Sequence, residues 1–280
     1  MKKIIAIAAA LGLVLGLCAC AGGGGNELLA AASPETSALM FYACTDGKSV
    51  KQLTMYDTNT EQEILGELAK VKAGPAPEWT AKDVTMPVYG LGIGRNDDGP
   101  GWLWCAWSNG YLILADGSAY KFDFDFASLE TGHDWRDSEE GLSIGRLPCS
   151  RALALGGDGW ISSILTPASE LSPPEGISMT LNYLDFAEGT AAVTFRNDSG
   201  EEWCYGTYFH LEVKLDGAWY LVPEETEQAF PDIAMLLPDG MSKQTSYSIR
   251  PYGELPPGLY RIAVEGMAAE FVVGASCIGD

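Results

Sequence analysis

Histidine and basic residues are scarce in this chain, and their scarcity argues against several classes of function. Only two histidines, His133 and His210, occur among 280 residues. Lysine and arginine number 17 against 38 acidic residues, which gives a net charge of −21. A surface this acidic repels phosphate backbones, so the sequence predicts no nucleic-acid partner. It also repels anionic lipid head groups, so membrane attachment cannot depend on a basic patch.

Catalytic and metal-binding signatures are also missing. No two cysteines are spaced as Cys-x-x-Cys, and with two histidines a zinc site of the Cys/His type is not expected. Ser150 lacks the Gly-x-Ser-x-Gly context of a nucleophile elbow. Residues 96–99 have the composition of a turn and lack the spacing of a calcium-binding loop. We therefore predict no catalytic residue, no metal site and no cofactor.

The N-terminal apolar run is too short to cross a membrane. It spans residues 4–17 and follows Lys2 and Lys3, whereas a membrane-spanning helix needs ~20 apolar residues. A basic start followed by a short apolar run is typical of an export signal, which we predict over residues 1–19.

The stretch Leu17-Cys18-Ala19-Cys20 resembles the lipobox of bacterial lipoproteins. The resemblance implies cleavage before Cys20 and lipidation of its thiol, because Leu17 is too bulky to precede the lipidated residue at Cys18. Residues 20–36 would then be the lipidated cysteine and a flexible glycine-rich linker. An ordinary signal peptide cut near Ala19 or Ala21 is the alternative.

Seven cysteines occur, and the signal and the lipid would use two of them. The five that remain are Cys44, Cys105, Cys149, Cys204 and Cys277. An odd number cannot pair completely, so we expect at most two disulfides and at least one free thiol. Cys105 and Cys204 lie in aromatic strand patterns and are expected to be buried apolar residues.

Residues 37–166 are predicted to form an α+β domain, a β-meander with one packed helix. The helix is expected over residues 58–72, with a capping box formed by Thr58 and Glu61. Its apolar stripe comprises Ile64, Leu65, Leu68 and Val71. Strands are predicted at residues 37–43, 50–56, 84–93, 101–107, 111–114 and 119–124, and a short helix within residues 147–165. The Asn109-Gly110 pair is a strong signal for a hairpin.

The meander carries the candidate ligand-binding residues Trp102, Trp104, Trp107 and Tyr111. Exposed aromatic side chains on a sheet can stack on sugars or peptides. Strand alternation puts Trp102 and Trp104 on one face of the sheet and Trp107 on the other. The alternative to ligand binding is that these aromatic side chains pack against the predicted helix or against neighbouring strands.

Two carboxylates, Asp123 and Asp125, are predicted to lie on one side of a strand. A glycosidase needs two such carboxylates on either side of its substrate. A strand face exposed to solvent would show the same spacing and is the alternative.

A proline-rich linker is predicted at residues 167–176, and a β-sandwich over residues 177–273. Its strands are expected at residues 177–184, 190–196, 208–215, 218–222, 243–249, 258–264 and 270–273. In two of them, residues 179, 181 and 183 and residues 191, 193 and 195 alternate toward one face.

Two motifs stand out in the second half: residues 252–262 read Tyr-Gly-x-Leu-Pro-x-Gly-x-Tyr-Arg-Ile, and residues 216–223 read Asp-Gly-x-Trp-Tyr-x-Val-Pro. With these motifs, of which the first is the most specific, the second half resembles the bacterial immunoglobulin-like domain of Gram-positive surface lipoproteins. The resemblance implies an immunoglobulin-like fold in which the Tyr260 hydroxyl ties a corner of the sandwich. Residues 87–90 and 107–122 look similar to an uncharacterised domain that often precedes it, which implies no activity.

The chain is thus expected to be mainly β with an α+β N-terminal half. We predict a noncatalytic lipoprotein, held at the extracytoplasmic face of the cell membrane by its lipid. It would bind an envelope protein, peptide or glycan, or serve as a spacer. The alternative is a cell-wall hydrolase that uses Asp123 and Asp125.

Overall fold

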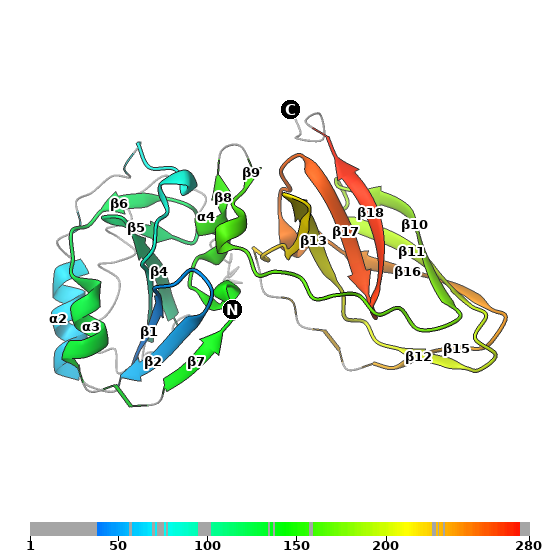
Figure 1. Cartoon of the computed structure of the whole chain (residues 1–280), viewed down its shortest axis with the longest axis horizontal. Coiled ribbons are helices and arrows are strands. Elements are labelled where there is room, and N and C mark those ends of the chain that lie inside the picture. The colour runs from blue at the N-terminus through cyan, green and yellow to red at the C-terminus, as the bar shows by residue number, and fades with distance from the viewer. Residues whose placement is uncertain are drawn as a thin grey trace, which may run out of the picture.

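The computed structural model describes residues 38–274, except residues 56–57, 69–70, 72–75, 77, 95–101, 134, 137, 157–158, 226–227, 229 and 232. The predicted signal, Cys20 and the linker to residue 36 lie outside the described residues, as do Cys277 and the side chains of Thr58 and Glu61. Within the described part, no helix has both the length and the apolar character needed to cross a bilayer. The chain is mainly β, and Figure 1 shows two β-rich halves side by side.

The N-terminal half is built on one antiparallel sheet of seven strands in the order β6-β5-β4-β3-β1-β2-β7. The strands are β1 (Ala38–Cys44), β2 (Val50–Met55), β3 (Val88–Gly94), β4 (Trp102–Ser108), β5 (Tyr111–Leu114), β6 (Ala119–Lys121) and β7 (Ser138–Leu142). The predicted meander is confirmed, because β4, β5 and β6 are neighbours in the sheet. Asn109 and Gly110 both have positive φ angles, as a two-residue hairpin turn requires.

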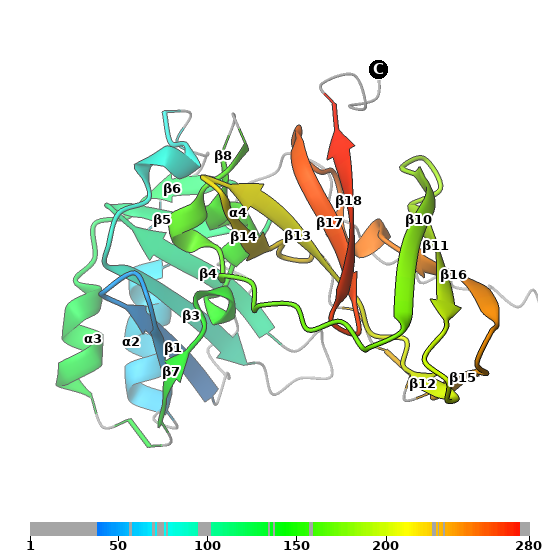
Figure 2. The same ribbon diagram turned by 45° about the vertical axis from the view of Figure 1, so that its right-hand side comes forward.

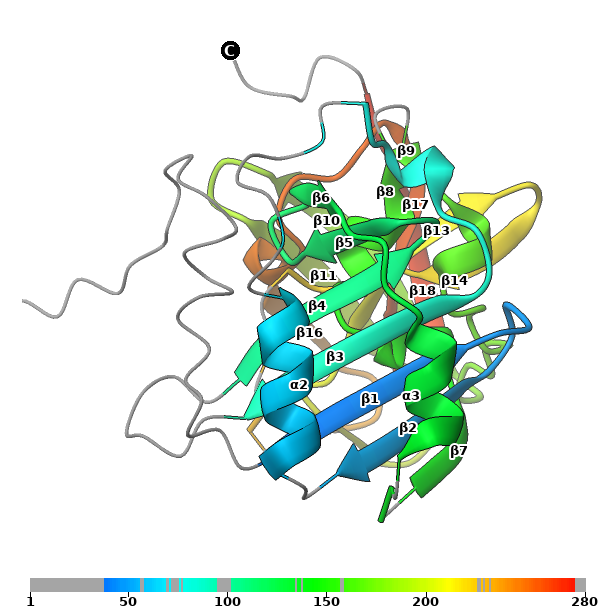
Figure 3. The same ribbon diagram turned by 90° about the vertical axis from the view of Figure 1, so that its left-hand side faces the viewer.

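Two helices cover one face of this sheet (Figure 3). They are α2 (Thr58–Leu68) and α3 (Phe126–Gly132). The predicted stripe of α2 is buried at Ile64 and Leu68, and the described helix runs as far as Leu68, within the predicted range. The apolar residues enclosed between helices and sheet form the meander core, which includes Phe41, Tyr89, Leu91, Cys105, Leu112 and Phe126.

The prediction that Asp123 and Asp125 lie on a strand is wrong. β6 ends at Lys121, and the chain leaves the sheet so that Phe126 is buried in the meander core. Asp125 is the N-cap of α3, and its carboxylate accepts a hydrogen bond from the backbone N–H of Ser128 at 3.3 Å. Both carboxylates are exposed, and the hydrolase alternative loses the geometry on which it depended.

The C-terminal half is a β-sandwich, and all seven predicted strands are present. One sheet contains β10 (Ile177–Asp185), β11 (Thr190–Asn197) and β16 (Ser242–Ser248). The other contains β14 (Ala218–Leu221), β13 (His210–Leu215), β17 (Gly258–Val264) and β18 (Met267–Val273). A ribbon of β12 (Trp203–Tyr205) and β15 (Met235–Leu237), which the sequence pattern did not predict, closes one end (Figure 2).

Packing inside the sandwich follows the predicted alternation in one strand and departs from it in another. Ala191, Val193 and Phe195 of β11 are completely buried. In β10 the pairing register shifts between Leu181 and Tyr183, and Tyr183 is 50% exposed. This bulge turns the tyrosine away from the core, so its predicted inward position is wrong.

The corner role predicted for Tyr260 is confirmed. Its hydroxyl donates a hydrogen bond to the carbonyl of Pro256 at 2.7 Å, and its ring is fully buried. The same oxygen accepts a hydrogen bond from the indole N–H of Trp160, which belongs to the first half of the chain, at 2.8 Å. A tyrosine that closes the sandwich therefore also joins it to the preceding domain.

The short helix predicted within residues 147–165 is present as α4 (Ser150–Ala154), followed by the strands β8 (Leu155–Gly156) and β9 (Gly159–Trp160). Four 3-10 turns complete the described elements, at Ala81–Asp83, Ile144–Arg146, Ser162–Ile164 and Arg250–Tyr252. In Figure 1, α4, β8 and β9 lie between the two halves.

Arg151 of α4 is the main polar tie across the joint. Its guanidinium donates hydrogen bonds to the carbonyls of Pro223 at 3.0 Å and Glu254 at 2.8 Å, and it stacks over the Trp160 ring at 5.1 Å. These contacts connect segments that are 72 and 103 residues apart in the sequence. The two halves are therefore held in one arrangement by side chains as well as by the chain itself.

Part of the predicted linker also belongs to the sandwich. The N–H of Leu221 donates to the carbonyl of Thr166, and the N–H of Ala168 donates to that of Trp219, both at 2.9 Å. The linker thus extends the sheet beside β14. One continuous core, the joint core, runs from Tyr42 and Leu153 of the first half to Tyr252 and Tyr260 of the second.

The joint can be tested with Arg151→Ala. The substitution removes two hydrogen bonds made by a charged group, each worth about 1.5–3 kcal/mol. We expect scanning calorimetry to show earlier melting and separate transitions for the two halves. Arg136→Ala, which removes an exposed guanidinium from the first half, is the control. An unchanged thermogram for Arg151→Ala would mean that the joint does not couple the domains.

Candidate functional site

The predicted aromatic residues lie on opposite faces of the sheet. Trp107 faces the meander core, where its ring packs 5.4 Å from Phe126 and its indole N–H donates to the carbonyl of Phe122 at 2.8 Å. Trp107 is therefore used in packing beneath α3. Trp104, three residues earlier, points to the other face and reaches the joint core.

Trp104 and Tyr111 are both partly buried against the joint core, so the structure brings these two predicted residues to the same side of the sheet. The Trp104 ring packs edge-on against Tyr42 at 6.3 Å and lies over Gly92, where a Cβ atom would come within 2.1 Å of the ring. Glycine at position 92 is what lets the indole approach the strand. The side chain of Trp102 lies outside the described residues.

Trp104 also lines a cleft between the two halves of the chain. The cleft has a volume of about 550 Å³, which is within the usual range for small-molecule sites. The first half contributes Trp79, Trp104, Asp116 and α4, and the sandwich contributes three glutamates, Glu224, Glu225 and Glu254. Because its walls come from both domains, the cleft exists only while the joint holds them together.

Hydrogen bonds fix the position of several charges in this cleft. The Glu224 carboxylate accepts from the backbone and side-chain N–H groups of Gln228 at 3.0 and 2.9 Å. Asp116 accepts from the backbone N–H of Ser118 at 2.9 Å. Burial lowers the pKa of Arg151, and the nearby Glu225 carboxylate partly offsets this shift. The guanidinium is thus occupied by the joint, while carboxylates remain along the cleft.

Trp79 also lines the cleft. Its indole nitrogen is buried and has no hydrogen-bond acceptor among the described atoms. A buried donor without a partner is uncommon in folded proteins.

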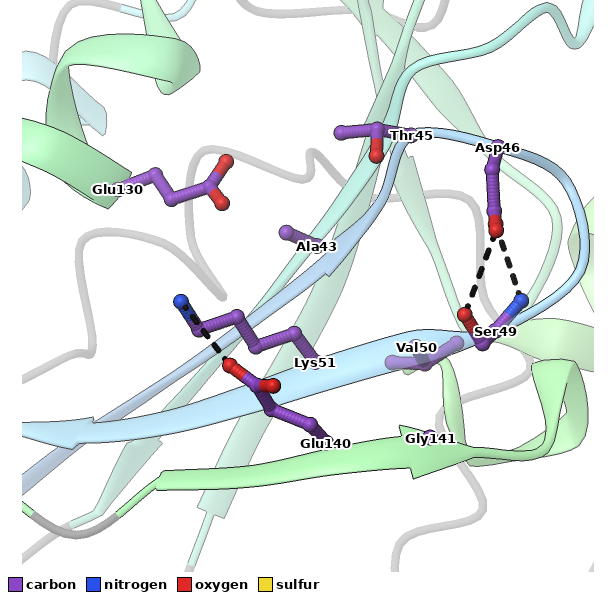
Figure 4. A pocket seen from close by; sticks show the side chains of 9 residues that line it. All are labelled: Ala43, Thr45, Asp46, Ser49, Val50, Lys51, Glu130, Glu140 and Gly141. Atoms are coloured by element: carbon purple, nitrogen blue, oxygen red, sulfur yellow. Dashed lines mark hydrogen bonds and ion pairs between the residues drawn. The ribbon is translucent and has the colours of Figure 1, made fainter.

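A second, smaller depression lies at the edge of the N-terminal sheet and has a volume of about 250 Å³ (Figure 4). Lys51 forms an ion pair with Glu140 at 3.5 Å, and Asp46 accepts hydrogen bonds from the backbone and hydroxyl of Ser49. Glu130 of α3 stands on the opposite wall in Figure 4. The depression has no aromatic wall, and most of its polar groups are already paired, so we favour the cleft as the candidate site.

The sandwich contains a buried ionic network, which we call the Glu212 network: His210, Glu212, Trp219 and Arg261. The side chain of Glu212 is 1% exposed. Its Oε1 accepts from His210 Nε2 at 2.8 Å, and its Oε2 accepts from Arg261 Nε at 2.6 Å. The Arg261 guanidinium stacks over the Trp219 ring at 4.2 Å. Both carboxylate oxygens are thus used, which identifies the network as a structural element.

Among the residues that the structure describes, the other nucleophilic and titratable groups do not assemble into a catalytic set. His133 contacts the hydroxyl of Thr60 at 3.4 Å, away from Ser150 in the cleft wall. Burial raises the pKa of the Cys105 thiol to about 12 and also raises that of Cys149, which disfavours the reactive thiolate.

The described cysteines, Cys44, Cys105, Cys149 and Cys204, are all free thiols. Cys105 is buried as predicted, whereas Cys204 is exposed, and its predicted burial is wrong. Cys204 lies on the narrow ribbon β12–β15, where Trp203 and Tyr205 provide the packing.

The sequence contains a signal for the Glu212 network but none for the cleft. The alternation of His210, Glu212 and Lys214 along β13 places three polar residues on one face and signals the Glu212 network. No comparable pattern marks the cleft, because Arg151 and the glutamates of the sandwich are far apart in the sequence.

The Glu212 network predicts a pH dependence of stability. Burial alone would raise the pKa of Glu212, but hydrogen bonds from His210 and Arg261 outweigh it, so the pKa lies below its ordinary value of 4.5. A depressed carboxyl pKa stabilises the fold fully above the unfolded-state pKa. That stabilisation is lost as the pH falls through the folded-state pKa.

Glu212→Gln is expected to lower the free energy of unfolding at pH 7 by about 3–5 kcal/mol, because Arg261 then loses its buried partner. It should also flatten the decline in stability that the unsubstituted protein shows below pH 4.5. Urea titrations over a pH series measure both effects. Glu175→Gln, at an exposed position, is the control. Equal stability of the two variants at pH 7 would contradict the role of the network.

Comparison with known families gives a match within the C-terminal half of the chain. The family described as "Bacterial Ig-like domain" matches residues 173–272. No curated protein and no solved structure matches the chain. Domains of this family are typically noncatalytic, act as binding or spacer modules, and are often extracellular. In both its sequence and its β-sandwich, the second half of the chain therefore matches the bacterial Ig-like domain.

Proposed function

We propose that this protein is a noncatalytic binding lipoprotein, anchored by Cys20 to the extracytoplasmic face of the cell membrane. Its Ig-like domain holds the N-terminal domain in a fixed orientation, and the cleft between them is the binding site. The partner is a component of the cell envelope. The observation that carries the proposal is the pairing of an Ig-like module with a cleft whose walls both domains supply.

Several features support binding as the role. A domain that serves only as a spacer needs no specific contact with its neighbour, whereas Arg151 and Trp160 fix this joint through hydrogen bonds. Trp104, one of the candidate ligand-binding residues, lines the resulting cleft. Aromatic side chains at such a position provide contact area at a low cost in conformational entropy.

The lipid anchor is supported by the order of the N-terminal signals. A short apolar run precedes Cys20 and a glycine-rich stretch follows it. A chain as acidic as this one gains no attraction from anionic lipids, so an acyl anchor is the attachment that fits its charge.

The anchor is tested by mass spectrometry of the protein purified from membranes of a bacterial host. We expect the chain to begin at Cys20 and to carry a diacylglyceryl group on its thiol. Cys20→Ala should retain the leader and lose the lipid, while Cys18→Ala, which alters only the signal, should be processed normally. An unmodified thiol at position 20, or an intact leader on the unsubstituted protein, would overturn the proposed anchor.

A further inference from the structure

The cleft between the domains carries an excess of negative charge. Its lining holds four carboxylates, those of Asp116, Glu224, Glu225 and Glu254, and one guanidinium, that of Arg151. Arg151 is committed to the carbonyls of Pro223 and Glu254 and to the ring of Trp160. A ligand that enters the cleft therefore meets a negative site, which the net charge of −21 on the whole chain reinforces.

The carboxylates are held in place and still have capacity to accept. Glu224 and Asp116 are positioned by hydrogen bonds from their own loops, and an ionised carboxylate can accept about four hydrogen bonds. Glu225 packs against Gly253, where a Cβ atom would come within 2.1 Å of its Oε2. Gly253 has a positive φ of 58°, so both its backbone conformation and the space above it favour glycine.

One wall of the cleft is aromatic. Trp79 and Trp104 line it from the N-terminal domain, opposite the glutamates of the sandwich. Indole rings attract cations through the negative potential of their faces, most strongly where water is partly excluded.

The spacing of the carboxylates favours an organic cation over a metal ion. Among the described residues, no three histidine, cysteine, aspartate or glutamate side chains converge closely enough to hold a metal. The volume of about 550 Å³ also accommodates a small organic molecule. Acidic groups that are spread around an aromatic-walled cleft match a cation whose charge is surrounded by alkyl groups.

We propose that the cleft between the two domains binds an organic ammonium ion, whose alkyl groups lie against Trp79 and Trp104 and whose charge faces Glu224, Glu225 and Glu254. This inference rests on the proposed binding function and names its ligand class. It makes Trp79 and the three glutamates specificity determinants, which their sequence positions alone did not indicate.

The test compares choline with its uncharged isostere 3,3-dimethylbutan-1-ol. The full chain is purified from membranes in dodecyl maltoside, and binding is followed by calorimetry and by tryptophan fluorescence. The two probes have nearly the same shape and differ in charge. We expect choline to bind about tenfold more tightly than the alcohol, and its affinity to fall as the ionic strength rises from about 0.01 to about 0.15 M.

Substitutions then locate the site. The triple variant Glu224→Gln, Glu225→Gln, Glu254→Gln should lose about tenfold or more in choline affinity. The control triple variant Glu170→Gln, Glu175→Gln, Glu201→Gln removes the same charge from exposed positions and should leave the affinity nearly unchanged. Trp79→Leu should weaken choline binding without introducing a charge.

The first triple variant changes side chains close to Arg151, so its thermal unfolding is measured as well. It is compared with the thermal unfolding of Glu254→Gln alone, in which Glu225 is retained. Equal affinity for choline and the alcohol, no binding of choline at millimolar concentrations, or equal losses in the two triple variants would overturn the inference. The lipid on Cys20 is measured by mass spectrometry of the same preparation. A protein that carries the lipid but does not bind choline would therefore contradict the proposed ligand class without contradicting the proposed anchor.

Discussion

The contact of Arg151 and Trp160 with the sandwich is the constraint on which the rest of the structure depends. Arg151 reaches two backbone carbonyls of the Ig-like half, and Trp160 donates to the hydroxyl of Tyr260. Tyr260 in turn closes its own sandwich by donating to Pro256. One tyrosine thus links the internal geometry of one domain to the placement of the other, and the cleft between them is a consequence of that link.

The two ionic sites of the Ig-like half show how the surroundings decide the role of a carboxylate. Glu212 is 1% exposed, and its two carboxylate oxygens are hydrogen-bonded to His210 and Arg261. Its charge is therefore fully paired within the fold. Glu225 and Glu254 are exposed beside the cleft. Burial with complete pairing makes a structural ion, whereas a partly solvated carboxylate beside an aromatic wall can still take a ligand.

The sheet of the N-terminal domain distributes its aromatic residues by simple alternation, yet the two faces have different uses. The face with Trp107 is covered by α2 and α3 and encloses the meander core. The face with Trp104 is turned toward the joint and becomes one wall of the cleft. A domain with helices on one face only leaves the other face for a second domain, and here the sandwich lies beside it.

The sequence by itself determined the meander strands, the tight turns and the two facing sheets of the sandwich, because alternation and turn chemistry are local. The Asn109-Gly110 hairpin and the α2 stripe were predictable from neighbouring residues, whereas the corner of Tyr260 was implied by the family resemblance. Only the tertiary structure decided that Asp125 caps a helix, since the burial of Phe126 draws the chain off the sheet. It also decided that Cys204 is exposed and that Arg151 meets Glu254 across 103 residues. A contact between distant segments depends on how whole domains pack, and no local pattern records that.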